Sequence, residues 1–229
     1  MKTLKRFVLL PLFCGLLLTT ACTEQYENDN GIDNGYYNGD DNGNGDTSFN
    51  RTITAEVVNG NNYDDIISTV GIKIWADDRS HTIATGTWAN GGFTTTLPET
   101  IDADEFFIAF LRREKGINIS DTSARTVEVS DISAYDEQQR RIGIIWYGDA
   151  DWRYEEMRLL YVDRDVTIIG TGTFSDIGQR HTYNLQLRAG WNRIYIISKK
   201  GEGEAYNGVF YISTEPISGL RWHFHYWGQ

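Results

Sequence analysis

The sequence predicts an all-β protein, because apolar and polar residues alternate over many short runs and turn residues separate these runs. Ile53 and Ala55 alternate with polar neighbours, and Tyr183, Leu185 and Leu187 do the same. A period of two with one polar face is typical of antiparallel strands that have one side in water. Helical spacing is scarce beyond residue 51, so strands are expected to form the body.

The strands are expected in order along the chain wherever these runs occur. The clearest runs are residues 52–57, 72–75, 105–111, 142–147, 183–187 and 220–226. Two of them, 105–111 and 142–147, are apolar on both faces and are therefore predicted to be central strands. Turn pairs with access to positive φ fall between the runs; they include Asn59-Gly60, Asn90-Gly91, Ala189-Gly190, Lys200-Gly201 and Asn207-Gly208. Two segments keep a helical alternative, residues 134–141 and 155–160.

A polar break at residues 148–153 predicts two domains within this body. Residues 51–150 hold enough runs for an antiparallel β-sandwich of the immunoglobulin- or transthyretin-like kind. Residues 151–229 are expected to form a second, smaller β-sandwich-like domain.

The first 21 residues have the pattern of a secretory leader. Lys2, Lys5 and Arg6 precede an apolar stretch that is too short for a permanent membrane span. Small residues then lead to Cys22, and this arrangement resembles a bacterial lipobox, although Thr19 stands where the motif usually has Leu. The resemblance implies that Cys22 is lipidated after cleavage of residues 1–21. An ordinary secretory leader cut nearby is the alternative.

Residues 22–50 are predicted to be a disordered tether rich in Asn, Asp and Gly. The chain has a net charge of −11, and loss of the three basic leader residues makes it −14. Seven acidic residues and no Lys or Arg lie in the tether. Such acidity argues against nucleic-acid binding, which needs a basic face, so the membrane is expected to be reached through acyl chains on Cys22. Asp40, Asn42 and Asn44 match half of a calcium loop, but Arg51 stands where its closing Glu belongs.

The residues indicate no catalytic site, cofactor or metal. The sequence contains two cysteines, and with Cys14 in the leader and Cys22 lipidated no thiol remains. His223 and His225 share a face of one expected strand, yet a metal would need a third ligand. An acidic cluster is interpreted as solvated surface, with glycoside hydrolysis as the weaker hypothesis; its members are Asp149, Asp151, Glu155, Glu156, Asp163 and Asp165. We therefore expect a protein that is not an enzyme.

The aromatic residues are the better indication of a ligand site. Seven Trp and thirteen Tyr are many for a chain of 229 residues. Trp75 lies on the polar side of its expected strand, Trp152 lies in the polar break, and Trp227 shares the histidine face near the end of the chain. A Trp on a wet face can stack on a sugar ring or anchor a protein interface. These three residues are the candidate ligand-binding residues, and burial between domains or under a loop is the alternative for each.

Two segments resemble small Bacteroidetes-type surface lipoproteins of unknown function: residues 90–98 (NGGFTTTLP) and residues 183–192 (YNLQLRAGWN), which Arg193-Ile194-Tyr195 follow. The resemblance implies an all-β body anchored in the outer membrane, and the acidic tether implies that it faces the cell exterior. The favoured expectation is non-catalytic glycan binding at the cell surface, similar to the accessory lipoproteins of glycan-uptake systems. A structural, adhesive or complex-stabilising subunit that binds protein partners is the alternative.

Replacing Cys22 by Ala should abolish the anchor, because the thioether to lipid forms on its sulfur. The variant is expected to lose incorporation of a radiolabelled fatty acid and to leave the detergent phase in a two-phase extraction, while Cys14→Ala leaves both unchanged. A Cys22→Ala protein that keeps its lipid label contradicts the assignment.

Overall fold

The computed structural model describes residues 49–76, 79–102, 115–150, 154–174, 179–199 and 208–228. All of them belong to one unit, Gly43–Gln229. Cys22, Trp152, the predicted tether up to residue 48 and the predicted strand 105–111 lie outside the described residues. None of the residues described forms a helix that is long and apolar enough to cross a membrane.

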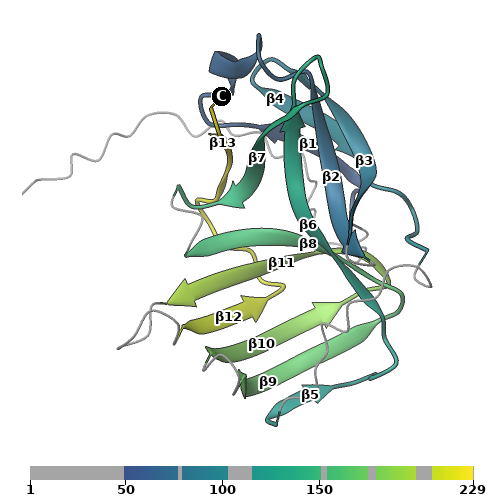
Figure 1. Cartoon of the computed structure of the whole chain (residues 1–229). Helices are drawn as coiled ribbons and strands as arrows, with labels where there is room; N and C mark the ends of the chain where they lie inside the picture. Colours follow the sequence, from purple (N-terminus) through teal and green to yellow (C-terminus); the bar gives the residue numbers. More distant parts are fainter. Residues whose placement is uncertain are drawn as a thin grey trace, which may run out of the picture. The chain divides into compact units, whose positions relative to one another are not determined.

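The prediction of an all-β protein is confirmed (Figure 1). The strands are β1 Thr52–Glu56, β2 Thr69–Ala76, β3 Arg79–Ala89, β4 Gly92–Thr96, β5 Ile117–Ile119, β6 Thr126–Tyr135, β7 Arg141–Gly148, β8 Glu155–Val162, β9 Val166–Phe174, β10 Gln179–Leu187, β11 Gly190–Lys199, β12 Val209–Ser213 and β13 Arg221–Tyr226, with one short 3-10 helix, η1, at Gly60–Tyr63. Residues 155–160 therefore form a strand and not a helix.

The thirteen strands of the described residues belong to one hydrogen-bonded sheet in the order β1-β4-β3-β2-β6-β7-β8-β11-β12-β10-β9-β5, with β13 paired to β7. The pairing of β10 with β12 is parallel, so the sheet is mixed and the expectation of purely antiparallel strands is wrong. The immunoglobulin- or transthyretin-like sandwich is not confirmed, because the observed sheet is open and continuous across the two predicted domains.

The predicted domain split at residue 150 is not confirmed either, because strands that precede this residue pair with strands that follow it. β5 precedes the split but pairs with β9, and β13 follows it but pairs with β7. Strand β6 belongs to both groups of strands, since its first residues pair with β8 and its last with β2 and β7. Figure 1 shows β6 running from the β8–β12 group to the β1–β4 group.

Two hydrophobic cores lie on opposite faces of β8 and β11. Leu159 and Trp191 belong to a first core with the inward residues of β1–β4, β6, β7 and β13. Leu160 and Ile194 are fully buried in a second core with residues of β9, β10 and β12. Successive side chains of a strand point to opposite faces, so β8 and β11 form a wall between the cores.

The local sequence determines where turns form and which faces of the strands are exposed to solvent. Strand β10 buries Tyr183, Leu185 and Leu187 in alternation, as predicted. Between β3 and β4, Asn90 and Gly91 both have positive φ, 52° and 74°, as a two-residue hairpin turn of type I′ requires. The segment with a helical alternative at 134–141 is instead the end of β6 and the turn to β7.

The Asp136 carboxylate organises that turn. It accepts hydrogen bonds from the Arg140 backbone N–H at 2.8 Å and from Arg140 Nε at 2.7 Å. Burial opposes ionisation of Asp136, but these hydrogen bonds and the charge of Arg140 outweigh it and lower the pKa of the carboxyl.

The two segments that carry the family resemblance meet in space. Trp191 Nε1 donates a hydrogen bond of 2.8 Å to the carbonyl oxygen of Pro98, 93 positions earlier. Trp191 is 4% exposed and packs edge-on against Tyr161 at 5.5 Å between ring centroids. Asn192 closes the adjoining β10–β11 turn, since its side-chain oxygen accepts from the Arg188 backbone N–H at 2.9 Å. Both segments therefore have structural roles.

Strand β8 should tolerate little truncation of its apolar side chains. Leu160→Ala is expected to lower the free energy of unfolding by about 2–5 kcal/mol, because the side chain is fully buried. Ile169→Ala on β9 is the matched control, since Ile169 is 49% exposed, and should change it by about 0.5 kcal/mol or less. Urea unfolding followed by tryptophan fluorescence measures both; equal effects would contradict the two-core arrangement.

Candidate functional site

Strands β6, β7 and β8 pair with one another over only part of their lengths, and a gap remains between the paired parts. Strand β6 pairs with β7 from Ile132 onward and with β8 only up to Glu128, while β7 pairs with β8 at Tyr147 and Gly148. Three segments lie between these pairings and have no strand partner across the gap in the part of the chain that is described: residues 129–131, residue 146 and residues 158–159.

A cavity of about 480 Å³ occupies this gap. Its lining includes Trp146 on one face of β7 and Tyr147 on the other, since consecutive strand residues point to opposite sides. Surface residues such as Trp227 and core residues such as Leu159 therefore line the same cavity. The gap connects the surface with the first hydrophobic core.

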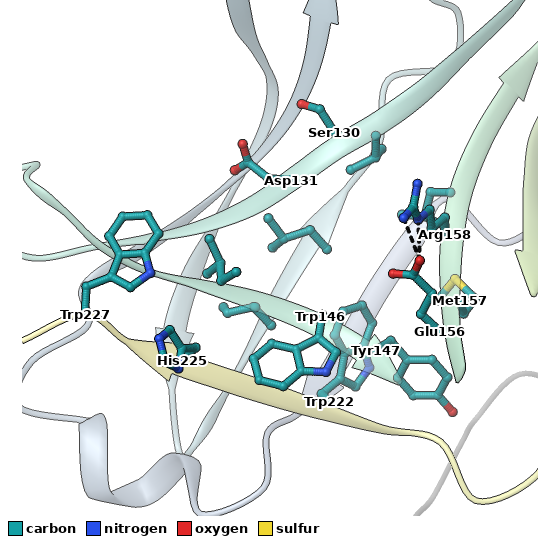
Figure 2. A pocket seen from close by; sticks show the side chains of 15 residues that line it. Ser130, Asp131, Trp146, Tyr147, Glu156, Met157, Arg158, Trp222, His225 and Trp227 are labelled. Carbon is teal, nitrogen blue, oxygen red and sulfur yellow. Dashed lines mark hydrogen bonds and ion pairs between the residues drawn. The ribbon is translucent and has the colours of Figure 1, made fainter. Parts of the chain in front are cut away.

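Figure 2 shows Trp227 at one end of the cavity. The residue is 46% exposed, and its backbone N–H donates to the carbonyl oxygen of Ile142 at 3.1 Å, which extends the β7–β13 pairing. The Arg141 guanidinium lies 4.6 Å from the centre of the indole ring. Arg141 also pairs with Asp131 at 3.4 Å. One cation thus orients both the aromatic ring and a carboxylate of the lining.

A second indole, that of Trp146, lies further along β7 (Figure 2). It stacks on His223 of β13 with ring centroids 5.3 Å apart and planes at 19°, because the two residues are directly paired. Trp146 Nε1 donates to the carbonyl oxygen of Asp149 at 3.1 Å. Both contacts fix the ring, so Trp146 presents a preorganised apolar surface to the cavity.

A charged group lies at the opposite end of the cavity from Trp227, where Figure 2 shows Arg158 beside Glu156. Arg158 Nη2 lies 2.6 Å from Glu156 Oε1, and Arg158 Nη1 lies 2.6 Å from Glu128 Oε1. Burial disfavours the charged guanidinium, but the two carboxylates outweigh it and raise the pKa of Arg158 above its ordinary value. Arg158 therefore stays charged and fixed between its partners.

The predicted ligand-binding residues do not form one site. Trp227 lines the cavity. Trp75 is 50% exposed on β2 and is not part of the lining, and Trp152 lies outside the described residues. Sequence reasoning missed Trp146, because its apolar run predicted a buried central strand. The departure of β6 from β7, which opens the lining around Trp146, follows from long-range pairing and leaves no local pattern.

The acidic cluster is dispersed by the fold. Glu156 lines the cavity, whereas Asp163 accepts from the Arg125 backbone N–H and Asp165 from the Ala189 backbone N–H, each at 2.8 Å. These two carboxylates therefore hold turns. Asp151 lies outside the described residues. Among the residues that are described, no three His, Cys, Asp or Glu side chains lie close enough to hold a metal ion.

Comparison with protein-family models, with curated proteins and with solved structures finds no match to this chain. The arrangement of the cavity is therefore the observation from which a function has to be inferred.

His223 should make stability depend on pH. Burial lowers the pKa of its ring below the ordinary 6.5, although a hydrogen bond to the Gly148 backbone and the charge of Asp149 act in the opposite direction. The unfolded chain then binds the proton more readily, so the contribution is present above the ordinary pKa and is lost as the pH falls through the folded value. His223→Gln should reduce the fall in unfolding free energy between about pH 7 and 5.

Urea titrations at several pH values measure this slope. Burial also lowers the pKa of His181. In His223→Gln the unfolding free energy should therefore still fall with pH by the amount that His181 contributes. An unchanged slope in His223→Gln would contradict the assignment.

Proposed function

We propose that this protein is a non-catalytic carbohydrate-binding lipoprotein whose ligand occupies the cavity between β6, β7, β8 and β13. The observation that carries the proposal is the composition of the lining, in which an exposed Trp at one end faces fixed charged groups at the other. Aromatic rings bind the apolar faces of a sugar, while polar groups bind its hydroxyls.

The size of the cavity supports a small ligand or a short segment of a larger one. Ligand sites of proteins usually enclose about 300–1,000 Å³ and combine apolar walls with a few polar groups. The 480 Å³ here falls within that range and suits one or two sugar rings of a polysaccharide. Trp227 lies near the surface, where further units of a chain would leave the cavity.

The cellular context is proposed from the sequence. Residues 1–21 and Cys22 support export and lipid attachment, and the acidic tether supports display on the outer face of the outer membrane. A binding protein on such a tether would capture polysaccharide outside the cell.

A structural or adhesive role is the second candidate. It is favoured by β1 and β5, which end the strand order among the strands described and so have one edge without a paired strand. Such edges accept a strand from another protein. Exposed Trp75 would belong to a protein-binding surface under this hypothesis.

Two exposed tryptophans offer a matched test of the proposal. Trp227→Ala should weaken binding to the glycan identified on an array by about 5- to 10-fold, because stacking contributes on the order of 1 kcal/mol. Trp75→Ala removes an equally exposed indole outside the cavity and should leave affinity unchanged. Isothermal titration with the purified protein measures both.

Each outcome bears on one of the two functions. Equal losses in Trp227→Ala and Trp75→Ala would remove the cavity as the binding site. A protein that binds no glycan on the array would contradict carbohydrate binding and favour the structural role.

A further inference from the structure

One residue of the lining has a buried donor without an acceptor. Trp222 lines the cavity and is 4% exposed, yet its Nε1–H has no hydrogen-bond partner in the described structure. The ring is fixed by Phe93 and Tyr147, at 5.5 Å and 5.1 Å between centroids. Buried N–H groups are nearly always paired, with protein or with ordered water, so this donor is available to an acceptor atom that enters the cavity.

The backbone of three strand edges borders the same gap. Residues 129–131, 146 and 158–159 border the gap without a strand partner across it. Each of these residues carries one N–H and one C=O, and successive residues of a strand direct these groups to opposite edges, so about every second residue presents them to the gap. A group that both donates and accepts hydrogen bonds, such as a sugar hydroxyl, matches this mixture of donors and acceptors.

The charges of the lining select against an acidic ligand. Asp131 and Glu156 contribute two carboxylates, and Arg158 contributes one cation. All three guanidinium nitrogens of Arg158 already donate to carboxylates, Nε and Nη2 to Glu156 at 2.9 Å and 2.6 Å and Nη1 to Glu128 at 2.6 Å. A second arginine, Arg141, lies beside Trp227 and pairs with Asp131 at 3.4 Å. The carboxylates of Glu128, Asp131 and Glu156 thus outnumber the guanidinium groups of Arg141 and Arg158, and both arginines are already ion-paired, so an anionic sugar would meet net negative charge.

We propose that the cavity binds a neutral, hydroxyl-bearing sugar ring, with a ring or hydroxyl oxygen accepting from Trp222 Nε1–H, and that it excludes uronic-acid and sulfated sugars. This inference rests on the proposed carbohydrate binding and specifies the ligand class for that cavity.

The test compares neutral hexose oligosaccharides with uronic-acid oligosaccharides of the same length. The purified protein should bind a neutral member at least 10-fold more tightly than its acidic counterpart. Glu156→Gln removes one carboxylate from the lining and should reduce the ratio of neutral to acidic affinity. Tighter binding of the acidic series, or an unchanged ratio in Glu156→Gln, would overturn the inference and leave carbohydrate binding intact. An absence of binding to either series would overturn both.

A direct readout on Trp222 separates hydrogen bonding from packing. In a ¹⁵N-labelled protein the seven tryptophans give indole N–H resonances, and Trp222→Phe identifies the one that belongs to Trp222. That resonance should shift downfield on addition of the neutral sugar, as the N–H acquires an acceptor. Trp222→Phe should weaken binding by about 3- to 10-fold. If the variant does not fold, the wild-type titration still decides: a Trp222 resonance that does not move at saturating sugar overturns the assignment.

Discussion

The two-sided apolar character of β8 is the constraint on which the rest of the structure depends. Met157, Leu159 and Tyr161 face the first core, while Leu160 and Val162 face the second. A strand of this kind is stable only when both faces are covered. The strands that cover each face of β8 must therefore supply a separate apolar layer. The chain connects the two groups of strands through β5, β6 and β13.

The cavity is a consequence of the same arrangement. Strand β6 cannot follow β7 and β8 along their full lengths, because each belongs to a different group of strands. The three separate pairings leave a gap that side chains of both faces line. Toward the N-terminal end of β8, the face that carries Leu160 carries Glu156 and Arg158 instead. The wall between the cores therefore ends in a charged group beside the gap.

Local pattern predicted the strands well and the pairings poorly. Alternation was sufficient for β10 and for the exposure of Trp75 and Trp227, because it depends only on which face of a strand is wet. The pairings of β5 with β9 and of β13 with β7 join distant segments, and no local pattern encodes them. The same reason explains why Trp146 was missed: its surroundings depend on where β6 departs from β7.

The position of β13 has a consequence for the order in which the chain can fold. Leu220, just before β13, and Trp222 within it complete the first core, and Trp222 also forms a parallel bridge to Val57 near the start of the body. A contact between the two ends of the body closes late, because the entropy of the long loop must be overcome first. The N-terminal strands therefore complete their core only after the C-terminal strand has been synthesised. A chain that lacks its final residues would expose the first core to solvent and to proteases.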